Sequence, residues 1–327
     1  MGIRIVGTGK YLPEKIVTNE DMARIVDTSD EWITTRTGIK QRPVETPLLN
    51  HEMGARAAEA ALADAGIPVE EVDLVIASSC TADYLTPSLA CLVARELGIE
   101  KAACVEINCA CAGFVSAVDM AKRYLDDPEY QTALVVSSEL LTKMVDYEDR
   151  ATCVLFGDGA GAVVLQKSEG FYYSEMGSDP ASAHHLFARG MPASSQFREE
   201  PFDPEIDGFG SSRGLHQDGQ DVYKFATRVM PKAIRKACEK AGISPEELDW
   251  VFPHQANLRI LETAAKNLHL PMEKVYVNIQ DHGNMSSACI PVCLAEACEQ
   301  DRIKPGDKVC IVGFGGGLVY AAAVFEW

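Results

Sequence analysis

The fold of this chain is decided by a stretch that occurs twice, first as Ala65-Gly-Ile-Pro-Val-Glu-Glu-Val-Asp-Leu-Val75 and again as Ala241-Gly-Ile-Ser-Pro-Glu-Glu-Leu-Asp-Trp-Val251. In each copy a helical segment stops at a glycine, an acidic turn follows, and apolar residues begin a strand. The two copies lie 176 residues apart. We infer that the chain consists of two similar halves.

The same offset of 176 residues continues beyond the quoted stretch. It pairs Asn108 with Asn284, Cys111 with Ser287, Ala112 with Ala288, and the strand Ala133–Val136 with Val309–Val312. One register held over so many residues indicates an internal duplication rather than a coincidence.

Each half alternates helices with near-continuous apolar strands, among them Leu74–Ala77, Ala133–Val136 and Ala162–Leu165. This pattern favours an α/β fold whose mostly parallel sheets are covered on both faces, with helices sandwiched between two sheets. We predict an N-terminal half over residues 1–170 and a C-terminal half over residues 220–327. Residues 171–219, rich in Gly, Pro, Ser and acidic residues, are expected to form an irregular insertion in which His184 and His185 lie on a surface loop.

The composition excludes several classes of protein. With 327 residues, 47% hydrophobic and 24% charged, it is typical of a soluble globular protein. The apolar runs are too short to cross a bilayer and no secretory signal is visible, so we expect no membrane association and a cytoplasmic location. The net charge of −18 argues against nucleic acid as a partner. The eleven cysteines include no CxxC pair, and we expect mostly buried, reduced thiols and no metal site.

Cys111 is the candidate nucleophile. It lies in Asn108-Cys-Ala-Cys-Ala-Gly-Phe114, directly before a segment with apolar helical periodicity. This setting predicts a thiol at a helix N-terminus, where the dipole favours the thiolate and lowers the cysteine pKa from its usual value of about 8.5. A thiolate is the nucleophile that thioester chemistry requires.

His254 and Asn284 are the candidate partners of Cys111. His254 follows an apolar strand, and Asn284 lies in the turn His282-Gly-Asn-Met-Ser-Ser-Ala288. Open α/β sheets place ligands at the C-terminal ends of strands, so we expect the three side chains to converge on a covalent acyl-transfer site. The run Gly313-Phe-Gly-Gly-Gly317 suits either an oxyanion hole or a tight turn before an edge strand.

Cysteine, histidine and asparagine also make up the site of papain-like proteases. A protease uses its asparagine only to orient the histidine that serves as base. The doubled α/β frame, the absence of a Cys-Trp element after Cys111 and the expected cytoplasmic location count against hydrolysis.

Taken together, these segments resemble the ketoacyl-acyl-carrier-protein synthase III family, the initiating condensing enzymes of bacterial fatty acid synthesis. The resemblance runs nearly end to end and implies the thiolase-like duplicated fold, in which layers are stacked α-β-α-β-α. Its marks are Gly7-Thr-Gly9, Tyr11-Leu-Pro13, Asp27-Thr-Ser-Asp-Glu-Trp-Ile33, Arg36-Thr-Gly-Ile39, Ala110-Cys-Ala-Gly-Phe114, Phe156-Gly-Asp-Gly-Ala-Gly161, Pro253-His-Gln-Ala-Asn-Leu-Arg-Ile260, His282-Gly-Asn284 and Phe314-Gly-Gly-Gly317.

The resemblance implies a two-stage reaction without a cofactor. Cys111 would take an acyl group from acyl-CoA, and malonyl-acyl carrier protein would then enter. His254 and Asn284 would bind the thioester oxygen of the malonyl group and stabilise the enolate formed on decarboxylation. The backbone N–H groups of Cys111 and Gly316 would form the oxyanion hole, and the protein would be a homodimer.

The resemblance also implies binding residues. For CoA and its pantetheine arm these are Thr28, Trp32, Arg36, Arg150, Gly219 and Asn257. For docking of the acidic carrier protein, which requires a local positive patch despite the net charge, they are Lys224, Arg259 and Lys266. Arg228, Lys232 and Arg235 are interpreted as ordinary solvated helix charges.

The primer pocket is where the sequence departs from the family. The resemblance places Thr86 and Phe156 there, and short-chain members have a phenylalanine, reaching across the dimer interface, where this chain has Thr86. The smaller side chain predicts tolerance of primers longer or bulkier than acetyl, unless Tyr84, Leu85 or the insertion fills the space. Two alternatives remain: an acyltransferase of the same fold in secondary metabolism, and a non-catalytic relative that binds carrier protein.

Overall fold

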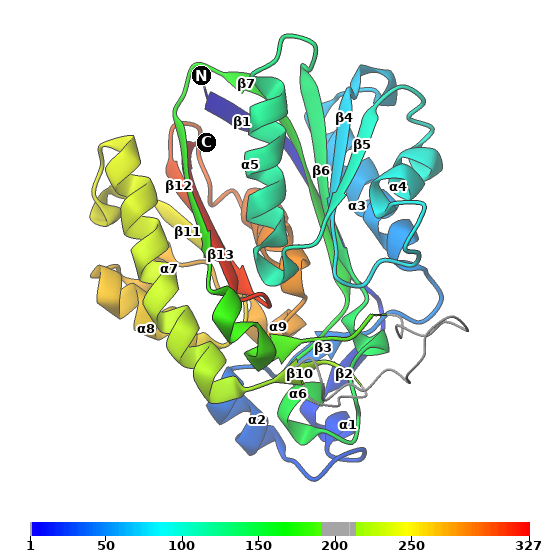
Figure 1. Cartoon of the computed structure of the whole chain (residues 1–327), viewed down its shortest axis with the longest axis vertical. Coiled ribbons are helices and arrows are strands. Elements are labelled where there is room, and N and C mark those ends of the chain that lie inside the picture. The colour runs from blue at the N-terminus through cyan, green and yellow to red at the C-terminus, as the bar shows by residue number, and fades with distance from the viewer. Residues whose placement is uncertain (1, 191–208, 210–213) are drawn as a thin grey trace, which may run out of the picture.

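The computed structural model describes residues 2–190, 209 and 214–327, and its two large sheets are drawn in Figure 1. The first sheet has the order β1 (Gly2–Tyr11), β7 (Gly159–Ser168), β6 (Thr132–Glu139), β4 (Leu74–Ser78), β5 (Ala103–Ile107). The second has the order β8 (Tyr172–Ser178), β13 (Val319–Glu326), β12 (Lys308–Gly315), β11 (Trp250–Pro253). Two short ribbons pair β2 (Ile16–Thr18) with β3 (Gln41–Pro43) and β9 (Leu186–Phe187) with β10 (His216–Gln217).

The described residues form ten α-helices. They are α1 (Asn19–Met22), α2 (Asp30–Thr37), α3 (Asn50–Ala65), α4 (Leu89–Leu97), α5 (Gly113–Leu125), α6 (Arg150–Cys153), α7 (Gly219–Ala241), α8 (Leu258–Leu268), α9 (Ile279–His282) and α10 (Cys289–Glu299). Helices α3 and α4 cover the outer face of the first sheet, and α7 and α8 cover that of the second. Helices α5 and α10 lie between the sheets, which confirms the predicted thiolase-like layering.

The internal repeat is present in the structure at the predicted offset. The 3₁₀ turn Ala110–Ala112 corresponds to the turn Ser286–Ala288, and both begin with a residue of positive φ, at 44° and 49°. Strands β6 and β12 start and end 176 residues apart. Both α3 and α7 end at a left-handed glycine. The duplication therefore places the turns before α5 and α10 in equivalent positions.

The strand directions differ from the prediction of mostly parallel sheets. In the two large sheets β4 is parallel to β5 and β6, and β11 is parallel to β12. The other pairs, β1 with β7, β6 with β7, β12 with β13 and β13 with β8, are antiparallel. Each sheet is therefore mixed. A strand covered by helices on both faces is continuously apolar whichever way its neighbours run, so the pattern could not reveal direction.

The segment between the halves is more regular than the predicted insertion 171–219. Its first residues form β8, an edge strand paired with β13, and β9 pairs with β10, which lies near its end. His185 lies beside the Asp218 carboxylate, with 2.9 Å between Nδ1 and Oδ2. The rest of the predicted insertion, residues 191–208 and 210–213, lies outside the described residues.

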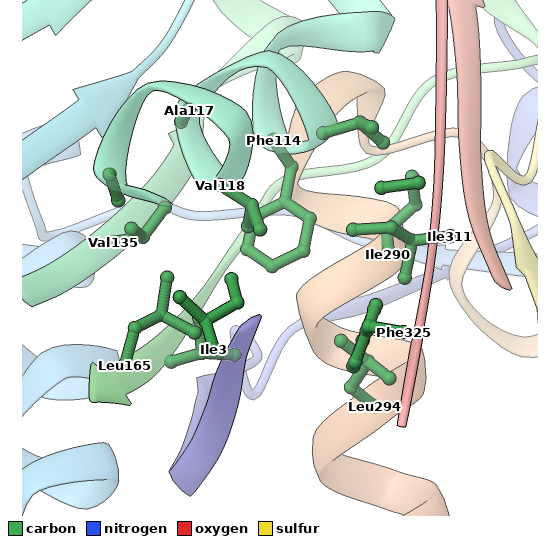
Figure 2. Close-up of a cluster of buried hydrophobic side chains, with 14 of the residues drawn as sticks. Ile3, Phe114, Ala117, Val118, Val135, Leu165, Ile290, Leu294, Ile311 and Phe325 are labelled. Carbon is green, nitrogen blue, oxygen red and sulfur yellow. The ribbon is translucent and has the colours of Figure 1, made fainter. Parts of the chain in front are cut away.

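The main core fills the layer between the two sheets. Figure 2 shows Phe114 and Val118 of α5 packed among side chains of both sheets and of α10, including Ile290 and Phe325. Phe114 is completely buried. The turn before α5, which carries Cys111, is thus anchored by the core at Phe114.

Phe114→Ala should lower the free energy of unfolding by about 3–5 kcal/mol, because it removes a ring from a closed layer and leaves a cavity. Urea titration of the purified variant measures this change. Ile25→Ala, at a side chain that is 57% exposed, should change the same quantity by less than about 0.5 kcal/mol. A loss for Phe114→Ala as small as that of Ile25→Ala would contradict the role given to this layer.

Candidate functional site

A cavity of about 400 Å³ is lined by residues from both halves. Cys111, His254, Asn284 and Gly316 all line it, so the structure brings together the four residues predicted to share a site. They come from the turn before α5, the end of β11, the turn after α9 and the end of β12.

The backbone at Cys111 is held against the glycine run that ends β12. A Cβ atom on Gly315 would lie 2.7 Å from the Cys111 nitrogen, and one on Gly313 would lie 2.7 Å from its carbonyl oxygen. Real Cβ atoms do not approach backbone atoms this closely, so both positions require glycine. The close contact leaves the backbone of Gly316 at the cavity wall beside Cys111.

The pKa of Cys111 is shifted in the direction opposite to the predicted one. Burial raises the pKa of the Cys111 thiol to about 12, and the nearby Ser286 hydroxyl lowers it only in part. The thiol does lie at the N-terminus of α5, as predicted. A buried thiolate loses its hydration, which disfavours the charged form and raises the pKa. The resting thiol is therefore protonated at neutral pH.

His254 is a buried, neutral imidazole. Its backbone N–H donates to the Val312 carbonyl oxygen at 2.8 Å, and its ring meets the Phe314 ring edge-on with centroids 5.4 Å apart. Burial lowers the pKa of His254 to about 3, with a smaller opposing effect of the Ser286 backbone. Within the described part of the chain, Nδ1 has no hydrogen-bond partner. A neutral ring carries one N–H donor and one lone pair.

Asn284 is oriented by its own turn. Its side-chain oxygen accepts a hydrogen bond from the Ser286 backbone N–H at 2.8 Å. Its backbone pairs with the segment after α6, because its N–H donates to the Leu155 carbonyl oxygen at 2.9 Å and its carbonyl accepts from Gly157 N–H at 3.0 Å. With the amide oxygen already bonded, the NH₂ group is the part of Asn284 free to bind a ligand.

The rate of any step that uses His254 as a neutral donor should show no inflection near pH 6.5. The pKa of about 3 keeps the ring neutral from pH 5.5 to 8, because the ring gains a proton only at pH values well below this range. Single-turnover measurement of the rate of that step across this range tests the expectation. A rate that falls with decreasing pH around 6.5, and ceases to do so in His254→Gln, would contradict it.

The predicted CoA residues are divided between the cavity and its surroundings. Trp32, Arg36, Gly219 and Asn257 line the cavity. The Arg36 guanidinium lies 4.5 Å from the Trp32 ring centroid, and Asn257 donates to the Arg36 carbonyl oxygen at 2.9 Å. Arg150 is not in the lining, but its guanidinium lies 5.0 Å from the same ring.

The remaining predicted residues lie in three places. Phe156 lines the cavity, whereas Thr28 and Thr86 do not, and Thr86 is exposed in the loop between β4 and α4. Lys224, Arg259 and Lys266 are exposed on the adjacent helices α7 and α8. Lys224 forms an ion pair with Asp221 at 3.0 Å.

Several lining residues were not singled out from the sequence. They are mostly apolar and include Leu141, Met144, Leu155, Leu186, Phe187 and Leu215. Sequence spacing gives no signal for these, since they come from separate turns and from the β9–β10 ribbon. Ser286 could have been found, because the repeat makes it the equivalent of Ala110 in the turn before Cys111.

The described residues contain neither a candidate metal site nor a candidate membrane span. They contain no group of three or more His, Cys, Asp or Glu side chains placed to hold a metal ion. None of the helices in residues 2–190 and 214–327 is long and apolar enough to cross a membrane.

The doubled α/β fold, with Cys, His and Asn on one cavity, defines an enzyme of the thiolase fold. Residues 105–180 match the family described as 3-oxoacyl-(acyl-carrier-protein) synthase III, and residues 238–327 match its C-terminal part. The chain belongs to the 3-oxoacyl-acyl-carrier-protein synthase III family.

Individual relatives are similar to this chain over nearly its whole length. A beta-ketoacyl-acyl-carrier-protein synthase III from Clostridium acetobutylicum is 45% identical over 327 residues, covering 99% of this chain and 98% of the relative. The crystal structure of 3-oxoacyl-acyl-carrier-protein synthase III from Aquifex aeolicus is 40% identical, with a TM-score of 0.91 and complete coverage of both chains. The priming beta-ketosynthase of the R1128 polyketide pathway is 34% identical, with a TM-score of 0.89 over 99% of this chain and 96% of that one.

Proposed function

We propose that this protein catalyses the decarboxylative Claisen condensation of an acyl-CoA primer with malonyl-acyl carrier protein, through an acyl-Cys111 intermediate. The product is a β-ketoacyl-acyl carrier protein, and the reaction initiates fatty acid synthesis. The observation that carries the proposal is that Cys111, the neutral His254 and the NH₂ group of Asn284 lie on one cavity.

In the first stage the Cys111 sulfur attacks the thioester carbonyl of acyl-CoA. The carbon–sulfur bond to CoA breaks, and the proton lost by Cys111 ends on the CoA thiol. The N-terminus of α5 stabilises the sulfur as its proton leaves. The backbone N–H groups of Cys111 and Gly316 bind the oxyanion of the tetrahedral intermediate.

In the second stage the malonyl thioester loses its carboxylate as CO₂. The electron pair of the broken carbon–carbon bond forms an enolate, whose oxygen is bound by His254 and Asn284. Neutral donors suit this task because they stabilise developing negative charge without titrating. The enolate carbon attacks the acyl group, and Cys111 leaves and regains a proton. The atoms balance without a cofactor.

The substrate-binding roles follow the same proposal. Thr28, Trp32, Arg36, Arg150, Gly219 and Asn257 bind CoA and its pantetheine arm. Lys224, Arg259 and Lys266 dock the acidic carrier protein. Their exposure on two packed helices beside the cavity supports this, although the whole chain carries a net charge of −18.

We further propose a homodimer acting in the cytoplasm. Tyr84 and Leu85, next to Thr86, are 51% and 82% exposed, which is unusual for such large apolar side chains outside an interface. In the dimer Thr86 would face the partner's primer pocket, which Phe156 of the partner subunit lines. Its small side chain favours primers longer or bulkier than acetyl.

Intact-protein mass spectrometry tests the reaction. The protein is incubated with acyl-CoA of increasing chain length and then with malonyl-acyl carrier protein. We expect an acyl adduct that the carrier protein discharges to a β-ketoacyl product. Discharge onto a hydroxyl or amine acceptor alone would indicate an acyltransferase of secondary metabolism. Absence of any adduct would favour a non-catalytic relative.

A further inference from the structure

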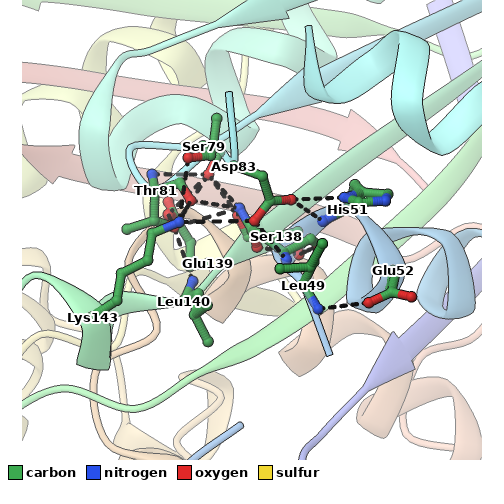
Figure 3. Close-up of polar contacts among 12 residues, drawn as sticks. Leu49, His51, Glu52, Ser79, Thr81, Asp83, Ser138, Glu139, Leu140 and Lys143 are labelled. Atoms are coloured by element: carbon green, nitrogen blue, oxygen red, sulfur yellow. Dashed lines mark hydrogen bonds and ion pairs between the residues drawn. The ribbon is translucent and has the colours of Figure 1, made fainter. Parts of the chain in front are cut away.

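A completely buried carboxylate, Glu139, lies at the end of β6, outside the residues that line the cavity. Figure 3 shows it among the polar contacts of the loop after β4. Its Oε2 accepts hydrogen bonds from the Thr81 hydroxyl at 2.8 Å and the Cys80 backbone N–H at 3.1 Å. A buried carboxylate is costly unless its oxygens are bonded in this way.

The other oxygen of Glu139 reaches the second half of the molecule. Its Oε1 accepts a hydrogen bond from the Ser287 hydroxyl at 2.7 Å. Ser287 is completely buried in the turn before α10, at the position that corresponds to Cys111 in the repeat. Glu139 therefore joins the loop after β4 to the turn that carries Asn284.

Ser287 is linked to the Asn284 amide through its neighbour Ser286. Ser287 and Ser286 are adjacent in one 3₁₀ turn, and the Ser286 N–H holds the Asn284 side-chain oxygen. The other oxygen, Oε2, is also linked to this turn. It accepts from the Cys80 backbone N–H, and the Cys80 sulfur lies 3.7 Å from the Ser286 hydroxyl. A shift of this turn would move the NH₂ group of Asn284 relative to Cys111.

We propose that Glu139 is a positioning residue for the condensation step, acting through Ser287 on the orientation of Asn284. Glu139 does not line the cavity that Cys111 and Asn284 share. The inference rests on the proposed function, since it assigns Asn284 to the malonyl stage. Loading of Cys111, which does not use Asn284, should be nearly independent of this contact.

The test compares two variants that each remove one hydrogen bond to Glu139. Ser287→Ala breaks the hydrogen bond on the side of Asn284, and Thr81→Val breaks the one to the loop after β4. Loading by acyl-CoA and discharge by malonyl-acyl carrier protein are timed separately, together with the melting temperature. Ser287→Ala should slow discharge about 10- to 100-fold while loading changes little, as expected when a reacting group is misplaced. Thr81→Val should lower the melting temperature similarly and leave the ratio of the two rates unchanged.

Glu139→Gln serves as the conservative variant if Ser287→Ala does not fold. Its amide keeps an acceptor for Thr81 and a polar partner for Ser287, so discharge should stay within about threefold of wild type, since a hydroxyl can accept as well as donate. A large loss in Glu139→Gln would show that charge rather than position matters and would overturn the inference. An unchanged ratio of rates in Ser287→Ala, or a selective loss of discharge in Thr81→Val, would also overturn it. Failure of the wild-type protein to load or discharge would instead overturn the proposed function, and the inference with it.

Discussion

Alanine in place of Cys111 is expected to abolish the acyl adduct and to lower the rate of condensation by about 10³-fold or more. Cys111 is the thiol at the N-terminus of α5 that lines the cavity beside Gly316. Without its sulfur no covalent intermediate can form, however well acyl-CoA binds. Mass spectrometry after incubation with acyl-CoA measures the adduct, and release of CoA measures turnover.

Cys109→Ala is the matched control for this change. Cys109 is two residues away in the same turn, is also partly exposed, and does not line the cavity. Its variant should load the acyl group at a rate close to that of wild type. Persistence of the adduct in Cys111→Ala, or its loss in Cys109→Ala, would assign the nucleophile to a different cysteine.

The repeat is the reason that so much of the fold could be predicted. A fixed offset relates buried residues in both halves, and burial on both faces leaves a clear apolar pattern in the sequence. The same offset predicted that the turn at Cys111 and the turn at Asn284 would be equivalent, and both line the cavity. Strand direction could not be predicted, because it depends on which neighbour each strand pairs with.

The electrostatics of the site could not be predicted from local sequence. The helix N-terminus at Cys111 is a local feature, whereas the burial that raises the pKa of its thiol to about 12 arises from segments distant in the chain. The same holds for Glu139, whose bonding partners Thr81 and Ser287 lie 58 and 148 residues away from it. Hydrogen bonds over such separations leave no pattern in a single sequence.

The second large effect is expected for Asn284→Asp. The change keeps the size of the side chain and one oxygen that can accept the Ser286 N–H, and it replaces the free NH₂ group by a second oxygen. A carboxylate there would repel the developing enolate instead of donating to it. Discharge of the acyl-enzyme by malonyl-acyl carrier protein should fall about 10²- to 10³-fold, the range found when one such donor is removed. Loading of Cys111 should continue, so the acyl-enzyme should accumulate.

The repeat supplies a matched control, Asn108→Asp. Asn108 is the equivalent of Asn284, lines the same cavity, and its side-chain oxygen accepts the Ala110 N–H at 3.2 Å. It therefore receives the same chemical change in a turn with the same side-chain hydrogen bond, but at an exposed residue on the side of Cys111, whereas Asn284 is buried. Single-turnover discharge should be reduced less than tenfold in this variant, since it leaves the donors to the enolate in place. Equal losses in the two variants would show that added negative charge in the cavity, rather than loss of the Asn284 donor, slows the condensation.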